Sequence, residues 1–152
     1  MKTTSIETVS AIGPQGAQGI SGPFVCYIFN TEEGQGNPLG PLTNYPEYTF
    51  GFGGTADFPA GMTDEFHLWV DSTGAASAAS MRIRDITNSQ TIATITILPG
   101  VAMSSRTTTV FANLPAGKAV MEVQLTIEAG DQLLFNIAPY TNGSSMVWIR
   151  KK

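Results

Sequence analysis

The single histidine of the chain, His67, lies in a segment where polar and apolar side chains alternate. Residues 65–71 read Glu-Phe-His-Leu-Trp-Val-Asp, and a β-strand there would place His67, Trp69 and Asp71 together on its polar face. Sugars stack on exposed aromatic rings beside carboxylates and other polar groups, so this face is a candidate glycan contact. A subunit interface would also bury such a face, and that alternative stays open.

The sequence patterns of enzymes and metal sites are missing. No Gly-x-Ser-x-Gly motif is present, and Cys26 lies in an apolar run, far from His67 in the sequence. One cysteine and one histidine cannot form a structural zinc site. The acidic pairs at 32–33 and 64–65 could bind calcium, but they lack EF-hand spacing, and we expect solvated acids. A symmetry axis could still gather three copies of one residue. We therefore predict no catalytic residues, no cofactor and no metal.

Nine short segments separated by turn residues are the elements that must position these side chains. Residues 119–128 alternate most regularly, and residues 80–86 and 91–98 flank a turn and predict a hairpin. The last segment is apolar at four successive positions, so Trp148 belongs to the core or to a subunit interface. The predicted strands are 24–30, 47–52, 65–71, 80–86, 91–98, 106–112, 119–128, 132–138 and 144–150. About eight or nine such strands favour an all-β, jelly-roll-like β-sandwich over residues 24–152.

Composition supports this fold class and limits the partners. The 152 residues are 42% hydrophobic but only 13% charged, with a net charge of −4, which excludes a disordered chain and argues against a helical bundle. So few charges suggest that other copies cover part of the surface. The basic residues are scattered except for residues 150–152, which we interpret as a solvated tail, so we expect no nucleic-acid partner. Without a long apolar run or a secretory signal, we expect no membrane association.

A glycine repeat precedes the strands. Glycine recurs at every third position, at Gly13, Gly16, Gly19 and Gly22. This is the spacing of a collagen triple helix, whose crowded axis admits only glycine, although a flexible linker is the alternative. A triple-helical neck over residues 13–23 implies a homotrimer whose β-sandwich head holds the three chains in register. Residues 1–12 would then be an anchor, with Ile6, Val9 and Ile12 as its docking side chains.

The chain resembles proteins that join a short collagen-like stalk to a trimeric jelly-roll head of the C1q/TNF-like type. The resemblance rests on the glycine repeat, the strand FVCYIFN directly after it, the hairpin IRDITNSQTIATITI, the segment EAGDQLLF and the apolar final strand. In size it is similar to a tailed-phage head-fibre or capsid-decoration protein.

This resemblance implies a structural virion protein, made in the host cytoplasm and displayed on the virion surface. It would dock on the capsid or another virion protein through residues 1–12. The alternative function is a glycan- or receptor-binding head, with a host-surface glycan as its partner. The two functions are compatible.

Overall fold

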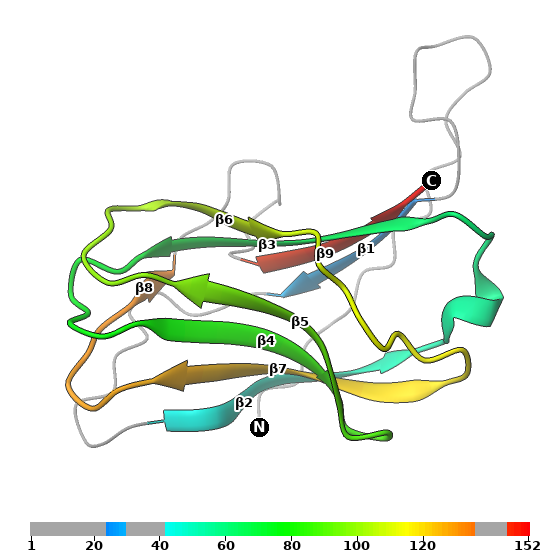
Figure 1. The fold of residues 1–152 in the computed structure, drawn as a ribbon, viewed down its shortest axis with the longest axis horizontal. Helices are drawn as coiled ribbons and strands as arrows, with labels where there is room; N and C mark the ends of the chain where they lie inside the picture. Colours follow the sequence, from blue (N-terminus) through cyan, green and yellow to red (C-terminus); the bar gives the residue numbers. More distant parts are fainter. Residues whose placement is uncertain (1–23, 30–41, 136–145) are drawn as a thin grey trace, which may run out of the picture.

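Two antiparallel β-sheets pack face to face in the computed structural model, which describes residues 24–29, 42–135 and 146–152 (Figure 1). The first sheet contains, in order, β1 (Phe24–Phe29), β9 (Met146–Lys151), β3 (Thr63–Asp71) and β6 (Ser104–Thr108), and the short β8 (Leu134–Phe135) also pairs with β3. The second sheet contains β2 (Leu42–Phe52), β7 (Ala119–Ile127), β4 (Ala79–Asp85) and β5 (Gln90–Ile97). A 3-10 turn, η1 (Thr55–Asp57), connects β2 to β3.

The strand pairs are nested along the chain. The β4–β5 hairpin is the innermost pair, and β3–β6, β2–β7 and β1–β9 follow outward. One long hairpin rolled up in this way gives the strand order of a jelly roll. The predicted all-β sandwich is therefore confirmed. Within the described residues, no helix is long and apolar enough to cross a membrane.

Alternating side chains fill the space between the sheets, as their period of two predicts. Phe66, Leu68 and Val70 of β3 are at most 1% exposed, and the inward residues of β7 are at most 6% exposed. Trp148 of β9 is fully buried, with its ring centroid 4.8 Å from that of Tyr27. Its place in the core is one of the two positions that the sequence allowed. Each such side chain contributes about 1.5–3 kcal/mol through the area it buries.

β6 ends earlier than the sequence predicts, and its early end shapes the molecule beside β3. It pairs with β3 only from Phe66 to Val70, and the chain leaves the sheet after Thr108. The backbone N–H of Ala112 then donates to the carbonyl of Ile92 in the other sheet, at 2.9 Å. Residues 63–65 of β3 are consequently paired with β9 on one side and with no described strand on the other.

Other strand boundaries also differ from the predicted ones. β2 begins five residues before its predicted start, and two register shifts accommodate Pro46, whose missing N–H cannot join a regular ladder. Of the predicted strand 132–138, the structure describes residues 132–135, in which Leu134 and Phe135 form β8 and Gln132 forms an isolated bridge. The predicted anchor with Ile6, Val9 and Ile12, and the whole glycine repeat, lie outside the described residues.

Candidate functional site

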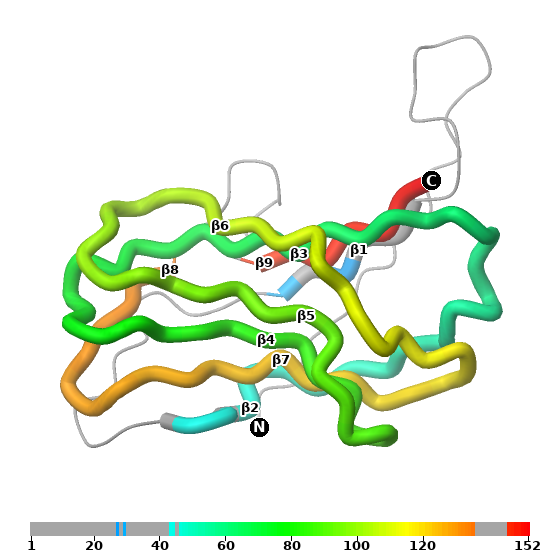
Figure 2. The backbone as a smooth tube through the Cα atoms, viewed as in Figure 1, coloured from blue at the N-terminus to red at the C-terminus, as the bar shows by residue number. Residues whose placement is uncertain are grey.

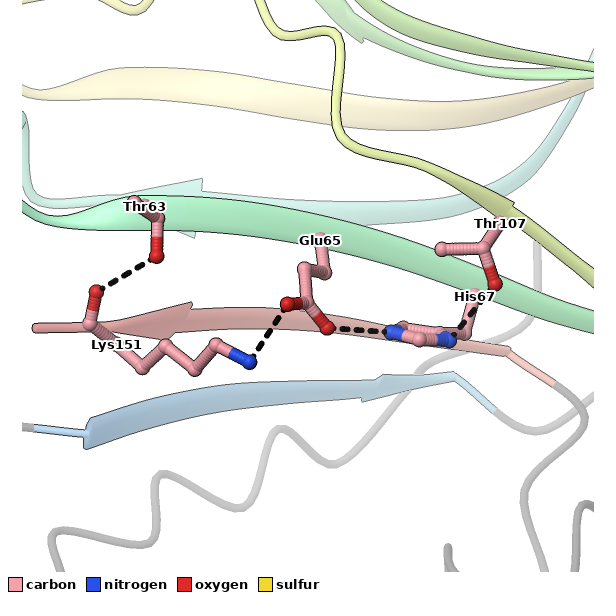
Figure 3. Close-up of polar contacts among 5 residues, drawn as sticks. All are labelled: Thr63, Glu65, His67, Thr107 and Lys151. Atoms are coloured by element: carbon pink, nitrogen blue, oxygen red, sulfur yellow. Dashed lines mark hydrogen bonds and ion pairs between the residues drawn. The ribbon is translucent and has the colours of Figure 1, made fainter. Parts of the chain in front are cut away.

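A row of polar side chains crosses the outer face of the first sheet (Figure 3). Lys151 Nζ lies 2.6 Å from Glu65 Oε1, and Glu65 Oε2 lies 3.0 Å from His67 Nε2. On the other side of the imidazole ring, Nδ1 is 3.0 Å from Thr107 Oγ1. Strand register explains the row, because Thr63 is opposite Lys151 on β9 and His67 is opposite Thr107 on β6.

Glu65 is the centre of this row. The hydrogen bond from Lys151 and, next, that from His67 hold the pKa of the Glu65 carboxyl below its usual value. Because a carboxylate only accepts hydrogen bonds, Nε2 of His67 donates to it, while Nδ1 shares a hydrogen bond with the Thr107 hydroxyl. The row thus fixes both the charge and the orientation of Glu65.

The hydroxyl, imidazole and carboxylate of Thr107, His67 and Glu65 follow the order of an acyl-transfer triad. Acyl transfer also needs preorganised N–H donors for an oxyanion. Thr107 lies inside the β3–β6 ladder, and the described residues place no helix N-terminus beside it. The contacts of the row hold the Glu65 carboxylate between Lys151 and His67.

The three predicted glycan contacts lie on the outer face of β3, but they differ in their surroundings. His67 belongs to the polar row and its side chain is 18% exposed, while Trp69 is partly exposed opposite Ser105. Asp71 accepts hydrogen bonds from the backbone N–H groups of Thr73 and Met103, at 2.8 and 3.1 Å. Its carboxylate therefore holds two loops in place at the end of the strand.

A pocket of about 550 Å³ opens at the start of β3, along the edge that no described strand pairs with. We call it the β3 pocket. Beside it, the segment after β6 turns toward the second sheet (Figure 2). Because that edge of β3 has no described neighbour, residues from both faces of the strand reach the pocket. Its lining combines two carboxylates, two hydroxyls, one aromatic ring and two aliphatic side chains: Met62, Thr63, Asp64, Glu65, Thr109, Phe111 and Leu114.

Asp64 forms the inner wall of the β3 pocket. Asp64 is 9% exposed. Its Oδ1 accepts a hydrogen bond from Trp148 Nε1 at 2.8 Å and lies 2.8 Å from Arg150 Nε. Burial raises the pKa of the Asp64 carboxyl, although the bond from Trp148 and the charge of Arg150 act against the rise. The second oxygen, Oδ2, has no hydrogen-bond partner among the described residues.

The structure corrects two expectations at this point. Arg150 and Lys151 are not part of a solvated tail, because both belong to β9, and Arg150 is 4% exposed with its guanidinium 4.6 Å from the centre of the Phe58 ring; only Lys152 is exposed. The acids at 64–65 are not simply solvated either, because each has a basic partner. No group of three or more His, Cys, Asp or Glu side chains that could hold a metal ion occurs in the described part of the chain.

The alternation of side chains along the two strands is the signal that could have revealed the buried ion pair of Asp64 and Arg150. Asp64 lies two positions from the inward Phe66 on β3, and Arg150 lies two positions from the inward Trp148 on β9, so both side chains fall on the inward faces. Two opposite charges that both fall on inward positions of paired strands indicate a buried ion pair, since an unpaired charge there would be very costly.

Comparisons with known proteins leave the family open. No protein-family model matches the chain, and no curated protein matches its sequence. Among solved structures, a carbohydrate-binding module of Cellvibrio mixtus lichenase 5A in complex with cellotriose is similar at 13% identity and a TM-score of 0.40, covering 99% of this chain and 90% of that one. The CBM22-1 and GH10 modules of Clostridium thermocellum xylanase 10B, complexed with xylohexaose, give 11% identity, a TM-score of 0.36, and coverage of 97% and 24%. Likenesses this distant carry no inference about the ligand.

Proposed function

We propose that this β-sandwich is a glycan-binding domain whose site is the β3 pocket. The observation that carries the proposal is the mixture of groups at one opening: carboxylates of Asp64 and Glu65, hydroxyls of Thr63 and Thr109, and the ring of Phe111. A sugar presents hydroxyl groups around its rim and an apolar C–H face. Carboxylate oxygens accept hydrogen bonds from the sugar hydroxyls, and an aromatic ring packs against the C–H face.

The outer face of β3 would extend the site beyond one sugar unit. Glu65 belongs both to the pocket lining and to the polar row, so the two features are continuous. At about 3.4 Å per residue, His67 lies about 7 Å along the strand from Glu65, and Trp69 about 14 Å. The expected ligand is therefore an oligosaccharide, with its end in the pocket and later units over His67 and Trp69.

Binding without catalysis is the expected activity. Both oxygens of Glu65 are engaged by Lys151 and His67, so this carboxylate is held as an anion instead of being poised as an acid. A general acid at neutral pH needs a raised pKa, while that of Glu65 is lowered. The row would orient an acceptor for sugar hydroxyls.

A glycan array tests the proposal directly. The full chain should bind at least one oligosaccharide, and Thr109→Val should weaken that binding several-fold because it removes a hydroxyl while nearly keeping the side-chain volume. Trp69→Ala should weaken long ligands more than short ones. Thr96→Val, an exposed threonine on β5 in the other sheet, is the matched control. A chain that binds no glycan refutes the proposal, and so does equal binding by Thr109→Val.

A trimeric virion role is a second, compatible proposal, supported by the glycine repeat at 13–22 and its resemblance to collagen-like necks. In it, residues 1–12 dock on a capsid or other virion protein, residues 13–23 form the neck, and residues 24–152 display the head. β1 starts at Phe24, whose register row continues through Lys151 to Thr63. A neck before β1 would therefore leave the head at the end that carries the β3 pocket.

Mass measurement of the purified chain at micromolar concentration tests this second proposal, which expects a trimer. Removing residues 1–12 should abolish attachment to the virion and preserve the trimer. A monomer refutes the neck, and attachment that survives the truncation refutes the anchor.

A further inference from the structure

The β3 pocket is lined by negative charges, whereas the positive charges that balance them lie outside its lining. Asp64 and Glu65 both line it, whereas the two cations that pair with them, Arg150 and Lys151, are not among the lining residues. Arg150 is turned toward the ring of Phe58, with its Cζ 4.6 Å from the ring centre. A ligand in the pocket would thus contact the two carboxylates and neither of their cations, since Arg150 is buried and Lys151 lies outside the pocket lining with 39% of its side chain exposed.

Asp64 also determines which kind of hydrogen-bonding group a ligand must present to it. It is nine-tenths buried, its Oδ1 is already occupied by Trp148 and Arg150, and its Oδ2 accepts from no described residue although Asp64 lines the pocket. A carboxylate oxygen can only accept a hydrogen bond. The group that satisfies it must therefore be a donor, which a sugar hydroxyl is and a sugar carboxylate is not.

We infer that the β3 pocket selects neutral, hydroxyl-rich sugars over uronic, sialic and other acidic sugars, with Asp64 as its specificity-determining residue. This inference rests on the proposed glycan-binding function. It goes further by naming the ligand class, since two fixed carboxylates repel a third anion that is brought into contact with them.

Matched sugar pairs test the inference on the unmodified full chain. Methyl glucoside and methyl glucuronide, methyl galactoside and methyl galacturonide, and the methyl ester of a sialylated oligosaccharide and its free acid form pairs that differ mainly in a carboxylate. The neutral member of each pair should bind about tenfold more tightly or better. This is the effect expected of one contact between like charges when the effective dielectric constant lies between that of a protein surface and that of a protein interior.

Two variants locate the effect. Asp64→Asn and Glu65→Gln should each reduce the preference for neutral sugars several-fold, and Glu65, with 24% of its side chain exposed, is the safer change if Asp64→Asn does not fold. Glu122→Gln is the matched control, because Glu122 lies on β7 in the other sheet. It should leave the preference unchanged.

The outcomes separate the inference from the proposed function. Acidic sugars that bind as well as their neutral partners overturn the inference and leave glycan binding intact. A preference for neutral sugars that persists in both site variants also overturns it, because the selection would then arise elsewhere. Absence of binding to every sugar removes the proposed function, and the inference with it.

Discussion

Phe111 should contribute more to glycan binding than to folding, and a leucine substitution separates the two contributions. Its ring lines the β3 pocket, and its centroid lies 5.5 Å from that of the buried Trp148. Leucine keeps an apolar side chain at this partly buried position but removes the flat ring on which a sugar would stack.

The size of the loss follows from these contacts. A stacked aromatic contact contributes about 0.5–1.5 kcal/mol beyond its buried area, which corresponds to about 2- to 12-fold in Kd. The contact with Trp148 is lost as well, so Phe111→Leu should lower the free energy of unfolding by about 1 kcal/mol. With a urea m-value of about 1.5 kcal/mol/M, the midpoint should fall by less than about 1 M, so the variant stays folded in the binding assay.

Phe58→Leu is the matched control. Phe58 is also a partly buried ring at the edge of the core, 6.2 Å from Phe52, but it does not line the pocket. Isothermal titration with the best array ligand, together with urea unfolding, should show a similar stability loss in both variants and weaker binding only in Phe111→Leu. Equal binding losses in the two variants would show that a loosened scaffold causes the effect, and unchanged binding by Phe111→Leu would eliminate the ring as a platform.

Three further predictions concern the structure around the pocket. Trp148→Phe removes the N–H that Asp64 accepts and should cost about 1–3 kcal/mol in urea unfolding, whereas an unshifted midpoint would mean that Arg150 alone satisfies the carboxylate. Burial raises the pKa of the Asp64 carboxyl above 3.8, so the folded chain binds the carboxyl proton more tightly than the unfolded chain does. The stability that this proton contributes is present below pH 3.8 and is lost as pH rises through the pKa of the folded state. Wild type should thus lose stability relative to Asp64→Asn as pH rises from about 4, and a difference that is constant with pH contradicts the argument. Gly54→Ala should destabilise far more than Gly61→Ala, since both have positive φ but only the Cβ at Gly54 would meet backbone, 2.3 Å from the carbonyl oxygen of Ala116; equal melting temperatures would refute this.

The alternation of polar and apolar residues within each segment determined which side chains lie between the two sheets. Alternation in segments such as 65–71 and 119–127 reports which side chains are inward, because successive strand residues point to opposite faces whatever the partner strand is. The burial of Phe66, Leu68 and Val70 was therefore predictable, as were the β4–β5 hairpin and the outer position of His67.

Tertiary structure alone decided where the candidate site lies. Nothing local states that β9 pairs with β3, so the sequence could place Glu65 near His67 but could not bring Lys151 to it across 86 positions of chain. The β3 pocket likewise exists because β6 ends at Thr108 and its chain crosses to the other sheet, leaving the start of β3 paired with β9 on one edge and with no described strand on the other. Periodicity within one segment carries no information on pairing between segments, and pairing is what converts scattered acids, hydroxyls and one aromatic ring into a pocket.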